Sequence, residues 1–229
     1  MEINKTVTSL IEVPELVEKR RGQIVAAATE LFSSQGFYST TIKDIARLAG
    51  ISSGLIYQYV REKEDVLLLV LLEVVDSYAR EIPVAMVGID DPLERLVKAV
   101  HAYCRVVDRH RAATVLAYRS TKSLSPKRRE LIQQRETETN DIIRRTLIDC
   151  MDRGIIRRVN IDALTYQIVL TAHGWALKSW YFKSRLSLEG YVEANLDILL
   201  NGILTQAGRR HYSDITEGTP ETRSSDGMP

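Results

Sequence analysis

Hydrophobic residues recur at helical spacing along most of this chain, and no segment shows the strict polar–apolar alternation of a half-buried strand. The stretch before Gly36 is a clear example, because Ile24, Ala28 and Leu31 fall on one helical face. The pattern predicts nine helices, over residues 15–35, 42–49, 53–59, 64–81, 92–108, 112–122, 126–153, 161–184 and 188–206. We therefore expect an all-α protein, with three helices in an N-terminal head and the others in a C-terminal helical bundle.

Breaks in the pattern divide the chain into four parts. Residues 1–14 mix polar and apolar positions and end at Pro14, so we expect a flexible arm. A head over 15–62 and a helical body over 63–206 follow. Pro83 and Gly88 interrupt the first helix of the body, and Gly154 suits the end of a later one. Residues 207–229 are rich in Gly, Ser, Thr, Pro and charge, a composition typical of a disordered tail.

Two short helices joined by a tight turn are predicted just after residue 40. Thr41 offers a hydroxyl N-cap to the first, and Gly50 suits the left-handed residue that ends it. Ser52 can cap the second helix. Ala46 is small where two helices must cross closely, as in a helix-turn-helix. Because the second helix carries hydroxyls, an amide and aromatic rings, it suits the phosphates and base edges of a DNA major groove.

The segment from about residue 18 to 68 resembles the DNA-binding domain of the TetR family of transcription regulators. The residues that carry the resemblance are Ala27, Leu31, Phe32, Gly36, Thr40, Thr41, Ile45, Ala46, Ala49, Gly50, Ile51, Ser52, Gly54, Tyr57, Tyr59, Lys63, Glu64 and Leu67. Val60 departs from the family pattern, which often has phenylalanine there. The resemblance implies a homodimer whose two recognition helices enter successive major grooves of a palindromic operator. It also implies a transcriptional regulator, more often a repressor than an activator.

Candidate DNA contacts lie on the two short helices and immediately beside them. Near base edges we expect Ser52, Ser53, Gly54, Leu55 and Gln58. The family pattern implies phosphate contacts at Thr41, Tyr57, Tyr59 and Lys63, and Lys43 and Arg47 join them as further candidates. Tyr57 and Tyr59 have an alternative place in the core of the head, although both cannot face inward. The basic run 19–21 either reaches the DNA backbone or minor groove, or is a solvated helix start.

Charge is distributed unevenly along the chain. The 229 residues have a formal net charge of only +1, which excludes a polycation that coats nucleic acid in bulk. Between Lys19 and Lys63, however, seven residues are basic and three are acidic. This local excess suits phosphate binding by a small module, although an ordinary solvated surface would show it as well.

Other functional classes find little support in the sequence. The run 50–54 matches the G-x-S-x-G nucleophile elbow, but a helical segment precedes it where the elbow needs a strand. The histidines and cysteines lack metal-ligand spacing and no Gly-rich phosphate loop is present, so we expect no metal, no cofactor and no catalytic activity. Cys104 and Cys150 do not indicate a disulfide framework. Neither a signal peptide nor an apolar run of about 18 residues is found, which predicts a cytoplasmic protein without a membrane anchor.

The last two long helices are expected to form the dimer interface. By family analogy they pair with the same helices of a second copy in a four-helix bundle. The helix over 161–184 has a second apolar face of Val169, His173, Leu177, Trp180 and Tyr181, and the last helix offers Tyr191, Leu196, Leu199, Leu200 and Ile203. Apolar residues on two faces suggest burial on two faces, although a thicker core within one chain would explain them too.

The effector site is expected in a cavity among the helices over 66–81, 91–108, 112–122, 126–153 and 161–184. Its candidate side chains are Tyr78, His101, Tyr103, Tyr118, Gln134, Glu138, His173 and Trp175, each of which has an alternative as an ordinary core residue. Gln134 and Glu138 face inward only if the buried stripe of their helix runs through Leu131 and Ile142; in the other phase both are solvated. We expect a small hydrophobic effector that releases the DNA.

Two further possibilities concern what controls DNA binding. Aromatic and basic residues lie together at 118–122 and 180–185, near helix ends. That combination is similar to TetR-like regulators of fatty-acid metabolism, which sense acyl-coenzyme A thioesters, so an acyl-coenzyme A is one candidate effector. The alternative is a helical DNA-binding regulator that is controlled by a protein partner instead of a small molecule.

Overall fold

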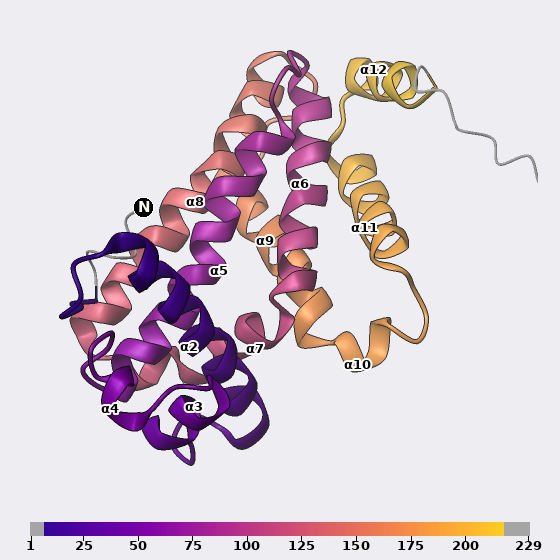
Figure 1. Cartoon of the computed structure of the whole chain (residues 1–229). Coiled ribbons are helices and arrows are strands. Elements are labelled where there is room, and N and C mark those ends of the chain that lie inside the picture. The colour runs from indigo at the N-terminus through magenta and orange to yellow at the C-terminus, as the bar shows by residue number, and fades with distance from the viewer. Residues whose placement is uncertain (1–6, 218–229) are drawn as a thin grey trace, which may run out of the picture.

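The computed structural model describes residues 7–217, which form eleven α-helices and one short 3-10 helix (Figure 1). The head consists of α2 (Pro14–Gln35), α3 (Ile42–Leu48) and α4 (Ser53–Ile56). The body consists of α5 (Lys63–Ala85), α6 (Pro92–Arg109), α7 (Arg111–Ser120), η1 (Thr121–Ser123), α8 (Pro126–Asp152), α9 (Ile161–Leu177), α10 (Ser179–Phe182), α11 (Leu188–Ile203) and α12 (Gln206–Glu217). Within this range the β-type pairing is limited to one isolated bridge, between Ile156 and Leu204, and the all-α prediction is confirmed.

The structure has two helices more than the nine that the sequence pattern predicts. The helix expected over 161–184 ends at Leu177, because Lys178 leaves helical geometry with φ −119° and ψ 27°, and α10 follows as a separate turn. Helix α12 begins at Gln206, and the rest of it lies in the segment from residue 207 that the composition predicts to be disordered. The remainder of that expected tail, 218–229, lies outside the described residues, as do residues 1–6 of the expected arm.

Local capping explains where several helices begin and end. Thr41 and Asp44 form a reciprocal capping box at the start of α3. Ser52 accepts the N–H of Leu55 at 3.1 Å and so caps α4. Gly50, between the two helices, has φ 69°, a left-handed conformation that costs glycine little. The turn of the helix-turn-helix therefore rests on residues that lie next to one another in the chain.

Helix α5 is the centre of the molecule. Every side chain from Val66 to Leu72 is buried, so the helix is apolar on all sides in this stretch. It packs against α6 and α8 in the body and against α2 in the head. The interruption expected at Pro83 occurs later than predicted, because the helix continues to Ala85 and ends in 3-10-type bonds at Met86. Since α5 begins directly after the head, its position sets the position of the head.

Residues 7–13 of the expected arm lie against the head. Val7 is only 1% exposed, and its carbonyl accepts a hydrogen bond from the Arg21 guanidinium. The N–H of Leu10 and the hydroxyl of Ser9 both donate to the carbonyl of Gln58, at 2.8 and 3.1 Å. This part of the chain therefore supports the end of α4 from outside the helix-turn-helix.

None of the helices between residues 7 and 217 combines the length and the apolar character that a bilayer-spanning segment needs.

Both cysteines are free and buried, and burial raises the pKa of each thiol to about 12. The thiols are thus protonated at neutral pH and serve as small apolar core residues.

Candidate DNA interface and effector site

Helix α4 and the two residues that follow it present polar groups to solvent, while Ile56 holds the helix in place. Ile56 is fully buried against the head core, which fixes the rotation of the helix. Ser53, Gly54 and Gln58 are exposed, and Tyr57 is half exposed. The side chain of Gln58 remains free to extend outward because its backbone carbonyl alone binds residues 9 and 10. This is the arrangement that a recognition helix needs, with a rigid inner face and a polar outer face.

The preceding helix carries the two basic candidates on its exposed side. Lys43 is exposed, and Arg47 is exposed with an ion pair to Asp44 at 2.8 Å. The same Asp44 carboxylate accepts the hydroxyl of Thr41 at 2.6 Å, and this hydrogen bond lowers the pKa of the carboxyl. Thr41 is therefore already engaged in capping, although its hydroxyl lies at the surface. Leu55 is partly buried and offers DNA less surface than the sequence pattern implies.

Tyr59 and Lys63 are corrections to the expected set of phosphate contacts. Tyr59 is only 2% exposed, so its ring belongs to the core of the head, which was the alternative place for it. The Lys63 ammonium donates to the carbonyls of Phe37, Tyr38 and Thr40 at 2.7, 3.2 and 2.9 Å, and so uses all three of its protons. Because the ring of Tyr59 is buried and the ammonium of Lys63 binds carbonyls within the head, neither group can contact a phosphate directly in this conformation.

Arg21 belongs to the basic run 19–21, for which contact with the DNA backbone is one of the two expected roles. Its side chain is buried and donates to the carbonyls of Val7 and Tyr59. It therefore joins the arm to the end of the helix-turn-helix, whereas Arg20 remains near the surface with a hydrogen bond to Gln23 at 2.9 Å.

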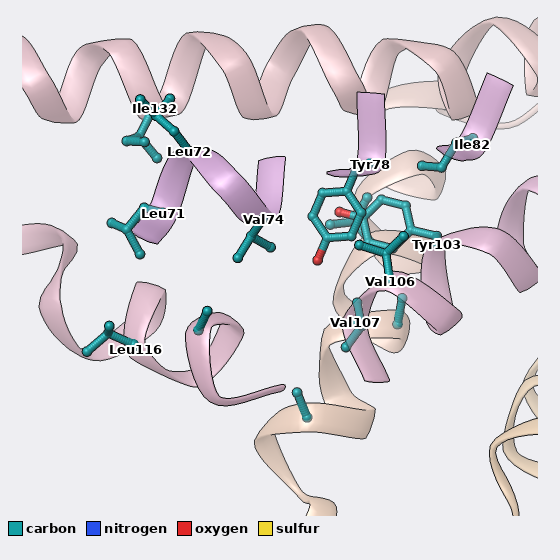
Figure 2. Close-up of a cluster of buried hydrophobic side chains, with 14 of the residues drawn as sticks. Leu71, Leu72, Val74, Tyr78, Ile82, Tyr103, Val106, Val107, Leu116 and Ile132 are labelled. Atoms are coloured by element: carbon teal, nitrogen blue, oxygen red, sulfur yellow. The ribbon is translucent and has the colours of Figure 1, made fainter. Parts of the chain in front are cut away.

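Four of the predicted effector residues meet in a single cluster inside the body. The rings of Tyr78 and Tyr103 stack with centroids 4.3 Å apart, and both hydroxyls approach Nε2 of His173, at 3.4 and 3.2 Å. On the other side of the imidazole, the hydroxyl of Tyr118 lies 2.8 Å from Nδ1. Figure 2 shows the two stacked rings among apolar side chains of α5 and α6, including Val106. Side chains from α5, α6, α7 and α9 therefore converge on one point.

Burial controls the protonation of this cluster. It lowers the pKa of His173 to about 4, so the imidazole is neutral at physiological pH. It raises the pKa of Tyr78 and of Tyr103, which keeps both phenols protonated. The cluster is thus a set of neutral donors and acceptors in an apolar surrounding, here called the Tyr–His cluster (Tyr78, Tyr103, Tyr118 and His173).

Three polar groups beside the cluster were not singled out from the sequence. The hydroxyl of Thr114 and the amide nitrogen of Asn140 are buried without a well-formed hydrogen bond to another described residue. The oxygen of Asn140 accepts from Tyr103 at 3.3 Å. Glu136 is partly buried, and burial raises the pKa of its carboxyl. Thr114 is a small polar residue next to apolar ones on the buried face of α7, which is a signal that the sequence offers, whereas Asn140 lies on a helix with polar residues on both faces and has no such signal.

The remaining effector candidates lie elsewhere. Trp175 is buried and donates its indole N–H to Asp108 at 2.7 Å, and His101 is partly buried on another part of α6. Gln134 and Glu138 are exposed and hydrogen-bond to each other at 2.9 Å. The phase that places Gln134 and Glu138 inward is therefore wrong, and α8 has the alternative phase, in which both are solvated. Its buried stripe is instead formed by Ile132, Thr139, Asn140, Ile143, Thr146, Leu147 and Cys150.

The faces expected to dimerise are largely filled within the chain. Val169, His173, Tyr191, Leu196, Leu200 and Ile203 are buried in the monomer, as the alternative of a thicker core implied. Other apolar side chains remain exposed on α9 and α11, and these are Tyr166, Leu170 and Ile198. A hollow of about 240 Å³ lies between these two helices, over α6. Trp180 and Tyr181, which the sequence pattern did select, are exposed on α10, whereas the exposed apolar residues of α9 and α11 are ones that it did not select.

Residues 7–217 contain no cluster of histidine, cysteine or acidic residues that would hold a metal ion. Ser52 follows the helix α3 and a turn, and its hydroxyl caps α4. The strand that a nucleophile elbow requires is not found there, so the serine has the role of a cap.

Comparison with known proteins identifies matches along most of the chain. The family model described as bacterial regulatory proteins, tetR family, matches residues 24–70, and the tetracyclin repressor-like C-terminal domain matches residues 89–203. The HTH-type transcriptional regulator HbdR of Aromatoleum sp. (strain CIB) is 52% identical over 215 residues, which is 94% of each chain. The HTH-type transcriptional repressor KstR2 of Mycolicibacterium smegmatis is 28% identical and covers 87% of this chain and 98% of that protein.

Solved structures show the same architecture. The ketosteroid transcriptional regulator KstR2 of Mycobacterium tuberculosis superimposes with a TM-score of 0.69 at 26% identity, over 82% of this chain and 96% of that one. AibR, in complex with isovaleryl coenzyme A and operator DNA, has a TM-score of 0.69 at 18% identity, over 79% and 98%. At that identity the likeness to AibR extends to the fold alone.

Proposed function

Since this chain belongs to the TetR family and is a DNA-binding transcriptional regulator, we propose that it binds a palindromic operator as a homodimer and releases it when a small effector enters the body. Repression is the expected outcome of operator binding, and two curated relatives named KstR2 are repressors. The effector is a small and mainly apolar molecule with at least one hydrogen-bonding group. An acyl-coenzyme A thioester is one candidate, and the AibR complex holds such a ligand.

The Tyr–His cluster is the main support for an effector site in the body. It lies between the helices expected to form the pocket, and it brings hydroxyls and an imidazole into an apolar interior. The buried groups of Thr114 and Asn140 lack good partners beside it. Because an unsatisfied buried polar group costs about 1–3 kcal/mol, a ligand that bonds to these groups gains that energy in addition to its apolar contacts. Side chains fill the cluster in this conformation, so entry of a ligand requires Tyr118, which is half exposed, to move.

The route from effector to DNA runs through α5. Tyr78 stands on this helix, and α5 starts directly after the head. A ligand that displaces the Tyr78 ring shifts α5 and changes the separation of the two recognition helices in the dimer. A coupling energy of about 1–3 kcal/mol is enough to lower operator affinity by roughly 5- to 150-fold.

The dimer is supported by the exposed apolar residues of α9 and α11. In a lone chain Leu170 is 55% exposed and Ile198 is 72% exposed. Their helices are also the ones that the family analogy pairs across a two-fold axis. One recognition helix reads few bases, so two copies are needed for useful affinity and specificity.

Fluorescence anisotropy with duplexes from the region upstream of the gene tests the DNA part of the proposal. We expect tight, competitor-resistant binding of one palindromic site by two chains, and Gln58→Ala is expected to change base preference at one position of each half-site. Sedimentation of the complex gives the stoichiometry. A monomeric protein that binds all duplexes equally would exclude the proposal.

The effector part is tested separately, with a panel of acyl-coenzyme A thioesters and the free acids. We expect one chemical class to lower operator affinity for the parent protein. Tyr103→Phe should weaken that response several-fold, because the hydroxyl that joins His173 and Asn140 is lost. A response that is unchanged in this variant would remove the effector from the Tyr–His cluster. Release by a purified protein partner but by no small molecule would favour the alternative control.

A further inference from the structure

A basic hollow lies where the head meets the body. It has a volume of about 260 Å³, and its walls come from the end of α2, one face of α7 and the corner between α9 and α10. Arg111 and Arg119 stand eight residues apart on α7 and therefore share a face of that helix. Lys183 faces them from beyond α10, and Ser33 of α2 and Ser179 of α10 add hydroxyls. Figure 1 shows α7 between the head and α9 at this junction.

The side chains that line this hollow carry a net positive charge. None of the side chains that line it is acidic. Arg111 has an ion pair with Asp108 at 3.3 Å, outside the lining set. Arg119 and Lys183 are exposed and have no acidic partner among residues 7–217. Two guanidinium groups, one ammonium and two hydroxyls around an apolar floor are the donors that a phosphate group requires.

The hollow and the Tyr–His cluster share two helices, α7 and α9, although no residue of the cluster lines the hollow. Tyr118 precedes Arg119 in the chain, and its hydroxyl lies 2.8 Å from Nδ1 of His173. Ala176, one helical turn after His173, lines the hollow itself. A molecule with its anionic group in the hollow would therefore lie against the same two helices that carry Tyr118 and His173.

We propose that this hollow is a binding site for the phosphate group of a phosphate-bearing small molecule. The inference deepens the proposed function and rests on it for the ligand's role, since it names the chemistry of one end of the effector site. A phosphate bound there contacts α2 of the head and α7 of the body at the same time. It therefore favours one placement of the head relative to the body over others.

Titration calorimetry of the full chain with inorganic pyrophosphate tests the site, with sodium chloride at matched ionic strength as the blank. We expect one molecule bound per chain. Arg119→Gln and Lys183→Gln should each weaken binding about three- to tenfold, because each removes one charge-assisted contact. Lys122→Gln is the matched control, since this exposed lysine lies three residues from Arg119 but outside the hollow. Lys43→Gln controls for phosphate binding at the DNA face.

The site is overturned if no heat exceeds the chloride blank, or if Lys122→Gln or Lys43→Gln loses as much affinity as Arg119→Gln. Coenzyme A provides the second probe. If coenzyme A binds more tightly than pyrophosphate and competes with it, the phosphate belongs to a larger effector. If pyrophosphate binds and coenzyme A does not, the phosphate ligand is a separate molecule. Both results support the site. Operator binding by the Arg119, Lys183 and Lys122 variants, without a probe, is expected to match the parent, because these side chains lie outside the DNA face. A parent protein that binds operator but no pyrophosphate refutes only this inference, and a parent protein that binds no operator refutes the proposed function.

Discussion

Arg128, near the start of α8, forms an ion pair with Asp65, near the start of α5. The Asp65 side chain is only 4% exposed, and its second oxygen accepts the N–H groups of Arg61 and Glu62 at 2.8 and 3.2 Å. One buried carboxylate thus lies at the end of the head, caps the first turn of α5 and binds α8 through Arg128. The guanidinium of Arg128 also reaches Glu62 at 2.9 Å, on the head side of the junction.

Arg128→Met should destabilise the protein by about 1–3 kcal/mol, because it leaves the buried carboxylate without its cation. Urea unfolding at pH 7 measures the loss. Arg144→Met is the matched control, since Arg144 pairs with Asp141 and Asp162 at the surface and exposed pairs contribute about 0–1 kcal/mol. Equal losses in the two variants would show that the Arg128 pair has no special role at the junction.

Lys63→Met is expected to affect stability more than the salt dependence of DNA binding. The ammonium satisfies three carbonyls of the loop after α2, so its removal should cost about 1–3 kcal/mol of unfolding free energy. The slope of log K against log salt should remain close to that of the parent. Lys43→Met, by contrast, should leave stability within about 0.5 kcal/mol and reduce that slope by about one. A reduced slope in Lys63→Met would mean that the ammonium turns outward to a phosphate on DNA.

His173 should make stability depend on pH below neutrality. Burial lowers its pKa to about 4, whereas the ordinary value is about 6.5, so between these values the unfolded chain binds a proton that the folded chain does not. The contribution of the neutral imidazole to the free energy of unfolding is therefore fully present above about pH 6.5 and is lost as the pH falls toward 4. Between pH 7.5 and 4.5 the parent should lose about 2–3 kcal/mol more than His173→Gln. His101 and His110 contribute to the pH dependence of both proteins alike, so the difference between the two reports on His173. If the free energy of unfolding falls equally with pH in the parent and in His173→Gln, His173 is not a buried neutral residue.

Gly208→Ala should loosen α12. A Cβ at this position would lie 2.0 Å from the carbonyl oxygen of Ile155, a contact that forces the backbone to move. We expect a loss of about 1–3 kcal/mol, together with faster amide exchange in residues 206–215. Gly22→Ala, in the open interior of α2, should instead stabilise by about 0.5–1 kcal/mol. Unchanged exchange in α12 of the Gly208 variant would show that its contact with Ile155 is dispensable.

The helix-turn-helix could be predicted from the sequence because its geometry depends on neighbouring residues. Thr41 caps α3 through a residue three positions away, Ser52 caps α4 in the same way, and Gly50 provides the left-handed turn between them. Each of these interactions is complete within a few residues. The same locality explains why the helices of the body begin near Asp91 and Asn160, whose side chains cap their first turns.

The phase of α8 could not be predicted in this way. Its polar residues are spread over both faces, so the sequence leaves two phases open, one with Gln134 and Glu138 inward and one with both solvated. Contacts with α5, α6 and α9 decided that Asn140 faces the interior instead. Helices from distant parts of the chain determine such a choice, and a single helix holds no information about them.

The sequence by itself determined the all-α class, the positions of most helices and the polar character of α4, because helix periodicity and capping act over one or two turns. Tertiary structure decided which of those polar groups are available. It buried the ring of Tyr59, used the Lys63 ammonium inside the head, and brought Tyr78, Tyr103 and His173 together from three helices. The physical reason is that burial and hydrogen bonding between distant segments depend on how the helices pack, and packing is a property of the whole chain.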